Sequence, residues 1–83
     1  MTDGQQLIDA LTADSWQVIG RGAAHVRLKY RSEPESIVVP LDPEAPEYAD
    51  QISIALIVLG LAADRGASAK RVLDELRASG VST

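Results

Sequence analysis

The residues whose side chains could best take part in catalysis or binding lie in one short segment, residues 21–31. It holds one histidine and four cations and no acidic residue. From position 25 onward polar and apolar residues alternate, as in a strand with one face in a core. Successive residues on one face of a strand are about 6.8 Å apart, a spacing that suits a chain of phosphates. The outward face is predicted to carry His25, Arg27, Lys29 and Arg31, and Arg21 comes just before it.

A histidine beside cations could carry out acid–base chemistry at phosphorus. The imidazole would act as general base, and the cations would stabilise the charge of a pentavalent phosphoryl transition state. A simpler interpretation is that His25 is an exposed strand residue and that the cations form a solvated face. Spacing alone favours this simpler interpretation.

The composition excludes several other kinds of chemistry. The chain has no cysteine, which excludes disulfides and thiolate metal sites. A single histidine excludes two-histidine mechanisms and most zinc sites, so we expect no metal, and no cofactor-binding motif is present. The formal net charge of −4 argues mildly against non-specific binding to nucleic acids. The acids are concentrated, because residues 33–50 contain six of them and no base.

Three helices and three strands are predicted to position the basic segment. Helices are expected from Asp3, as N-cap, to residue 13, over the apolar stretch 52–63, and from Ser68, as N-cap, to a cap at Gly80. Strands are expected at 16–20, 25–31 and 36–39, with a positive-φ turn at Gly20 and Gly22. The order α-β-β-β-α-α predicts a single two-layer α+β domain over residues 1–83, in which a three-stranded antiparallel sheet has all helices on one face.

The stretch 52–63, ISIALIVLGLAA, is the centre of this prediction. It is too short to span a bilayer, which needs about 20 apolar residues. A helix that is apolar nearly all round must be covered on more than one side. We expect the last helix to cover it, and the alternative is that part of it forms a homodimer or partner surface. The N-terminus lacks the features of a signal peptide, so a cytoplasmic protein is expected, with no membrane partner.

Several short pieces in order resemble the HicA family of toxins. They are LIDAL (7–11), Trp16, RGAAHVRL (21–28) and VPL (39–41). The resemblance covers roughly residues 5–60. It implies a core like a double-stranded-RNA-binding domain over about 3–65, followed by an additional C-terminal helix at 67–80. The Gly-Ser that precedes the family's histidine is Ala23-Ala24 here, and the glycine before the tryptophan is Ser15.

The resemblance implies a function for the basic segment. HicA toxins cleave mRNA and are neutralised by a HicB-type antitoxin, and their catalytic histidine corresponds to His25. In this interpretation RNA is bound by Arg21, Arg27, Lys29 and Arg31, without metal or cofactor. The competing hypothesis is a non-catalytic binding module, of a regulatory or phage type. Such a module would contact proteins through residues 33–50 or through the central helix.

Overall fold

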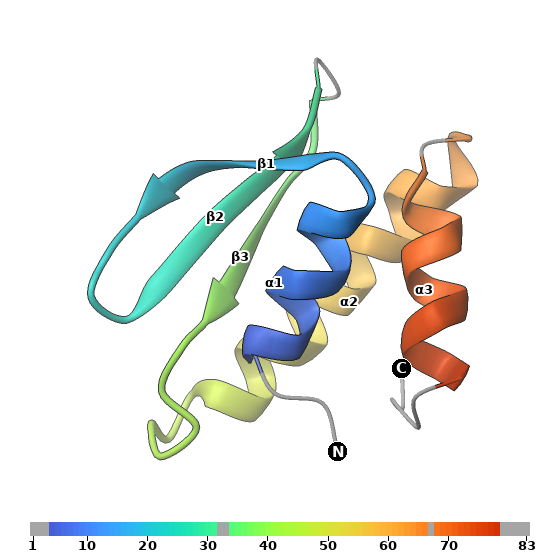
Figure 1. The fold of residues 1–83 in the computed structure, drawn as a ribbon. Helices are drawn as coiled ribbons and strands as arrows, with labels where there is room; N and C mark the ends of the chain where they lie inside the picture. Colours follow the sequence, from blue (N-terminus) through green and yellow to red (C-terminus); the bar gives the residue numbers. More distant parts are fainter. Residues whose placement is uncertain (1–3, 32–33, 67, 79–83) are drawn as a thin grey trace.

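A computed structural model describes residues 4–31, 34–66 and 68–78 and confirms the α+β prediction (Figure 1). The elements in chain order are α1 (Gly4–Ala13), β1 (Trp16–Arg21), β2 (His25–Tyr30), β3 (Ser36–Pro40), α2 (Tyr48–Asp64) and α3 (Ala69–Ala78). The predicted caps at Asp3 and Gly80 lie outside the described residues. Ser68, the other predicted cap, directly precedes α3, where its carbonyl oxygen accepts from the N–H of Arg71 at 3.0 Å and its hydroxyl donates to the carbonyl oxygen of Asp14 at 3.4 Å.

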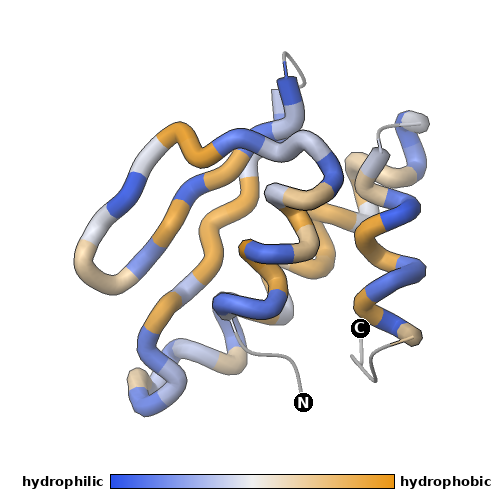
Figure 2. Tube along the Cα trace, in the orientation of Figure 1, coloured by the Kyte–Doolittle hydropathy of each residue, from blue (hydrophilic) through white to orange (hydrophobic). Residues whose placement is uncertain are grey.

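The three strands form one antiparallel sheet in the order β1-β2-β3. Residues directly opposite each other in an antiparallel pair project from the same face. Leu28 is opposite Ile37 and Val26 is opposite Val39, and these four side chains are buried on the face that is covered by helices, whereas Val18, opposite Leu28 on β1, is exposed. Hydrophobic residues recur along the strands and along α2 (Figure 2), and their buried side chains form one hydrophobic core, which is mostly aliphatic and includes Trp16.

The helices lie on one side of the sheet. Helix α1 packs against β1 and β3, and α2 packs against β3. Helix α3 packs against α2 and α1, which lie between it and the sheet in Figure 1. Its buried residues follow the helical period and are Ala69, Val72, Leu73 and Leu76. The prediction that the last helix covers the central helix is therefore confirmed for one side of α2.

A second face of α2 stays uncovered. Ile52, Leu56 and Leu59 point into the core, whereas Ile54, Ile57 and Leu61 are more than half exposed. Cover on more than one side was predicted and is observed, since α2 packs against both β3 and α3, but the sheet and α3 occupy only part of the circumference of the helix. Among the described residues, each helix is too short or too polar to cross a membrane.

The turn geometry differs from the sequence prediction at two places. Gly20 and Arg21 belong to β1, and the following turn is closed by Gly22, whose N–H donates to the carbonyl oxygen of His25 at 2.8 Å. Neither Gly20 nor Gly22 has a positive φ. Among the described residues, left-handed backbone occurs instead at Ser15 (φ 73°), Arg31 (φ 49°) and Gly66 (φ 81°).

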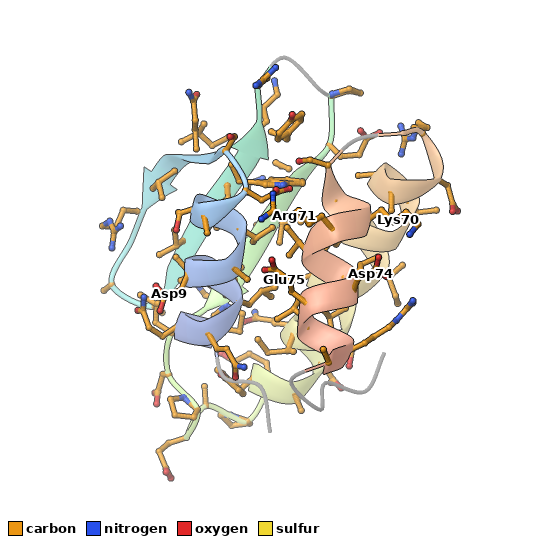
Figure 3. The ribbon with its side chains drawn as sticks, turned by 45° about the vertical axis from the view of Figure 1, so that its right-hand side comes forward. Asp9, Lys70, Arg71, Asp74 and Glu75 are labelled. Carbon is orange, nitrogen blue, oxygen red and sulfur yellow. The ribbon has the colours of Figure 1, made fainter. Side chains whose placement is uncertain are left out.

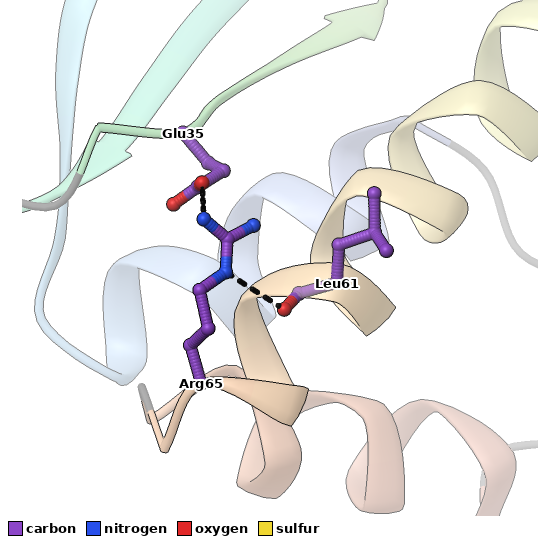
Figure 4. A network of polar contacts seen from close by, with 3 residues as sticks. All are labelled: Glu35, Leu61 and Arg65. Carbon is purple, nitrogen blue, oxygen red and sulfur yellow. Dashed lines mark hydrogen bonds and ion pairs between the residues drawn. The ribbon is translucent and has the colours of Figure 1, made fainter.

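Helix α2 ends in an ion pair that links it to the sheet. Arg65, just beyond the last turn, forms a salt bridge with Glu35, just before β3 (Figure 4). Its Nε also donates to the carbonyl oxygen of Leu61, at 3.4 Å. The Glu35 carboxylate is therefore directed toward the helices at the start of β3.

Candidate basic site on the open face of the sheet

The face of the sheet that is turned away from the helices carries the predicted basic row in part. The register places Gly20, Arg27 and Val38 side by side across the three strands. The neighbouring row is formed by Gln17, Lys29 and Ser36. No acidic residue belongs to either row, and the acid nearest in sequence to Ser36, Glu35, is paired with Arg65.

An open hollow of about 310 Å³ lies at one end of this face. It is lined by Gly20, Gly22, His25, Arg27 and Val38. A Cβ atom added at Gly20 would lie 3.7 Å from the Cβ of Arg27, so the absence of a side chain at Gly20 contributes to the space beside the arginine. The hollow thus brings together the predicted base and one predicted phosphate-binding cation.

His25 is half-buried and held in a defined orientation. Its Nε2 lies 2.9 Å from Oε1 of Gln51, in the first turns of α2. A carboxamide oxygen can only accept a hydrogen bond, so Nε2 must donate. In the neutral imidazole the proton then sits on Nε2, and Nδ1 is the atom that can accept another one. With Oε1 of Gln51 turned toward the ring, this contact holds the imidazole in place and leaves Nδ1 as the atom that can accept a proton.

Arg27 is exposed but is also held by a neighbour. Its Nη1 donates to Oγ of Ser36 on β3, at 3.0 Å. This contact fixes one edge of the guanidinium and leaves its other donors for an anion. Lys29 is on the same face, one row further along β2, and is half-buried.

The other two predicted RNA-binding residues do not lie beside Arg27 and Lys29 on the open face. The register of β1 shifts between Val18 and Gly20, and Arg21 consequently lies opposite Val26 rather than on the side of Arg27. A regular strand would have placed Arg21 on the open face. Arg31 lies beyond the end of β2, where its guanidinium carbon is 5.3 Å from the centre of the Tyr30 ring. The predicted four-cation row is thus reduced to Arg27 and Lys29.

Sequence reasoning missed two residues that support the site. Gln51 and Ser36 each hold a functional side chain, yet neither belongs to a recognisable motif. Ser36 could have been inferred, because it belongs to a predicted strand next to the basic row. Gln51 could not, because it lies 26 residues from His25 in the sequence and the contact depends on the packing of α2. Within the described ranges, no group of three or more His, Cys, Asp or Glu side chains could hold a metal ion.

Comparisons with protein-family models, with curated proteins and with solved structures found no match to this chain.

Proposed function

We propose that this chain is a HicA-like endoribonuclease of a toxin–antitoxin pair, which cleaves RNA without a metal or a cofactor. The observation that carries the proposal is that His25 and Arg27 line the same open hollow, on a face whose strand rows carry no acid. A second, smaller point comes from Ser15. Its left-handed backbone is the conformation that glycine adopts most easily, and the HicA-type sequences that this chain resembles have glycine there.

The proposed reaction is a transesterification within the RNA. Nδ1 of His25 removes the proton from a ribose 2′-hydroxyl, and the 2′-oxygen attacks the adjacent phosphorus. The bond to the 5′-oxygen of the next nucleotide breaks, and that oxygen takes up a proton. The products are a 2′,3′-cyclic phosphate and a 5′-hydroxyl. Arg27 and Lys29 stabilise the negative charge on the phosphoryl oxygens. In this function a HicB-like antitoxin is the expected partner.

The test uses purified protein and a labelled single-stranded RNA in the presence of EDTA. Wild type should cleave the RNA and leave cyclic phosphate ends, and His25→Ala should be slower by about 10²–10⁴-fold, as for loss of a general base. Arg77→Ala is the control, because this arginine lies on α3 and outside the sheet face. DNA of the same sequence should stay intact, since it lacks the 2′-hydroxyl. Folded wild-type protein that leaves RNA uncut would refute the proposal.

The alternative is a non-catalytic module that binds other proteins, and the net charge of −4 favours it. Expression in growing cells separates the two functions. A toxin should arrest growth in wild-type form and not as His25→Ala, whereas a binding module should be equally harmless in both forms.

A further inference from the structure

The exposed face of α2 is an apolar stripe of regular spacing. Ile54, Ile57 and Leu61 are 59%, 63% and 51% exposed, and they follow one another at intervals of three and four residues. At 100° per residue these positions fall within about 60° of one another around the helix. Continuing the same spacing leads to Asp50 in the first turn and to Arg65 after the last. We call these five residues the α2 stripe. It is apolar in the middle and has opposite charges at its two ends.

A groove runs beside the stripe, between α2 and α3. It has a volume of about 390 Å³, and its apolar lining includes Ile57, Leu61 and Leu73. Gly60 also lines it, and an added Cβ there would meet no atom within 4 Å. On its α3 side lie Lys70 and Asp74 (Figure 3), which form an i,i+4 salt bridge at 3.1 Å. The groove therefore offers room for side chains of a molecule that packs on the stripe.

We propose that a second copy of this chain packs on the α2 stripe, with the two α2 helices antiparallel across a two-fold axis near Ile57. In such a symmetric interface the same surface serves on both copies and must complement itself. A pairing centred between Ile57 and Val58 sets Ile54 opposite Leu61 of the second copy. The same pairing sets Asp50 opposite Arg65 of the second copy, and symmetry produces this ion pair twice.

The charges at the two ends of the α2 stripe favour a second copy of this chain as the partner, and they favour an antiparallel arrangement of the two α2 helices. A parallel arrangement would place Asp50 beside Asp50 and Arg65 beside Arg65, and both contacts repel. A membrane surface would favour cations at both ends of the stripe, and Asp50 is an acid. Within the protomer Arg65 uses Nη1 and Nε for Glu35 and Leu61, which leaves Nη2 for a further carboxylate. Exposed apolar stripes of this kind mark association surfaces, and this one is self-complementary.

The dimer is independent of the proposed RNA cleavage. The apolar residues of the stripe lie on α2, whereas the hollow is lined by residues of the strands and of the turn after β1, and the two meet only where Gln51 contacts His25. The two proposals rest on different observations, so the failure of one does not overturn the other.

Sedimentation equilibrium of the full chain, over concentrations up to about 200 μM, tests the proposal. Wild type should dimerise, and Ile57→Asp should be monomeric, since it buries a charge at the centre of the interface. Ile19→Asp is the matched control, because Ile19 is as exposed as Leu61 but lies on β1. Circular dichroism verifies that each variant is folded. A monomeric wild type, or a dimer that survives Ile57→Asp, would overturn the proposal.

A charge exchange tests the direction of the helices. Asp50→Arg and Arg65→Asp should each weaken the dimer by about tenfold, because each creates two repulsive contacts. Arg65→Asp also removes the ion pair with Glu35 of the same protomer, so the double variant should recover the affinity only in part, but by more than two independent effects would allow. Two weakening effects that simply add would contradict the antiparallel pairing. Wild type that binds vesicles of anionic lipid while it is monomeric in solution would show that the stripe is a membrane surface.

Discussion

His25 on β2 and Gln51 on α2 are joined by a hydrogen bond of 2.9 Å between Nε2 and Oε1. The two residues come from opposite layers of the fold, so this contact connects the edge of the hollow to the helix that fills the core. It makes Gln51 a positioning residue for the proposed base, because it fixes both the orientation and the tautomer of the imidazole.

Replacing Gln51 should alter cleavage without removing any group that touches RNA. Gln51→Leu removes the acceptor, and the rate of RNA cleavage should fall by about 10-fold or more while RNA affinity is preserved, because the reactive tautomer is no longer selected. Gln51→Glu keeps an acceptor at this position and should retain activity. Single-turnover cleavage rates and filter-binding affinities provide the two measurements. Equal loss in both variants would indicate a structural role for Gln51.

Arg27→Ala should weaken RNA binding and lower its salt dependence. One phosphate contact contributes about 0.7 to the slope of log affinity against log salt for a single strand, so the slope should become shallower by about that amount. Arg21→Ala tests the geometry, because the register removes Arg21 from the open face. It should change the slope less than Arg27→Ala does. Equal changes in the slope for the two variants would indicate that Arg21 also contacts RNA.

Two glycines should respond to alanine in opposite directions. A Cβ at Gly4 would overlap the carbonyl oxygen of Pro40, and overpacking of this kind costs about 1–3 kcal/mol of folding free energy. A Cβ at Gly60 meets no atom within 4 Å, so Gly60→Ala should stabilise the monomer by about 0.5–1 kcal/mol through helix propensity. Urea unfolding of dilute protein measures both. Similar effects at the two sites would contradict the packing described for α1.

Two leucines separated by a single residue in α2 should differ in how much their replacement by alanine destabilises the fold. Leu59 is fully buried, and Leu59→Ala should cost about 2–5 kcal/mol because the cavity closes only partly. Leu61 is half exposed, and Leu61→Ala should change the stability of the monomer by about 0.5 kcal/mol or less. The measurement is the free energy of unfolding at a concentration too low for dimers. A large loss at Leu61 would place this side chain in the core.

Ser15→Gly should stabilise the fold. Ser15 has φ 73°, a conformation that costs a residue with a Cβ roughly 1–2 kcal/mol and glycine almost nothing. Since glycine also gains freedom in the unfolded state, the net gain should be below about 1 kcal/mol, seen as a higher Tm. A lower Tm for Ser15→Gly would mean that the left-handed turn before Trp16 is not strained.

The sequence predicted the parts of this fold that depend on local patterns. Alternation at residues 25–30 identified β2, and the spacing of Val72, Leu73 and Leu76 identified α3 with its buried face. What escaped prediction depends on contacts between elements. The irregular register of β1 follows from its pairing with β2, and it decides where Arg21 lies. For α2, a run that is apolar all round contains no information about which face is left open.

The register shift in β1 also affects how the molecule behaves toward other strands. With the order β1-β2-β3, no other strand among the described residues pairs with the outer edge of β1 or of β3, and a free edge offers unpaired backbone groups to any strand from another molecule. At Ile19 the shift interrupts the regular spacing of these groups along β1, and β3 is short and ends at Pro40, which has no N–H to donate. An incoming strand finds no long uninterrupted ladder on either side. Both features work against edge-to-edge pairing of the sheet with strands of other molecules.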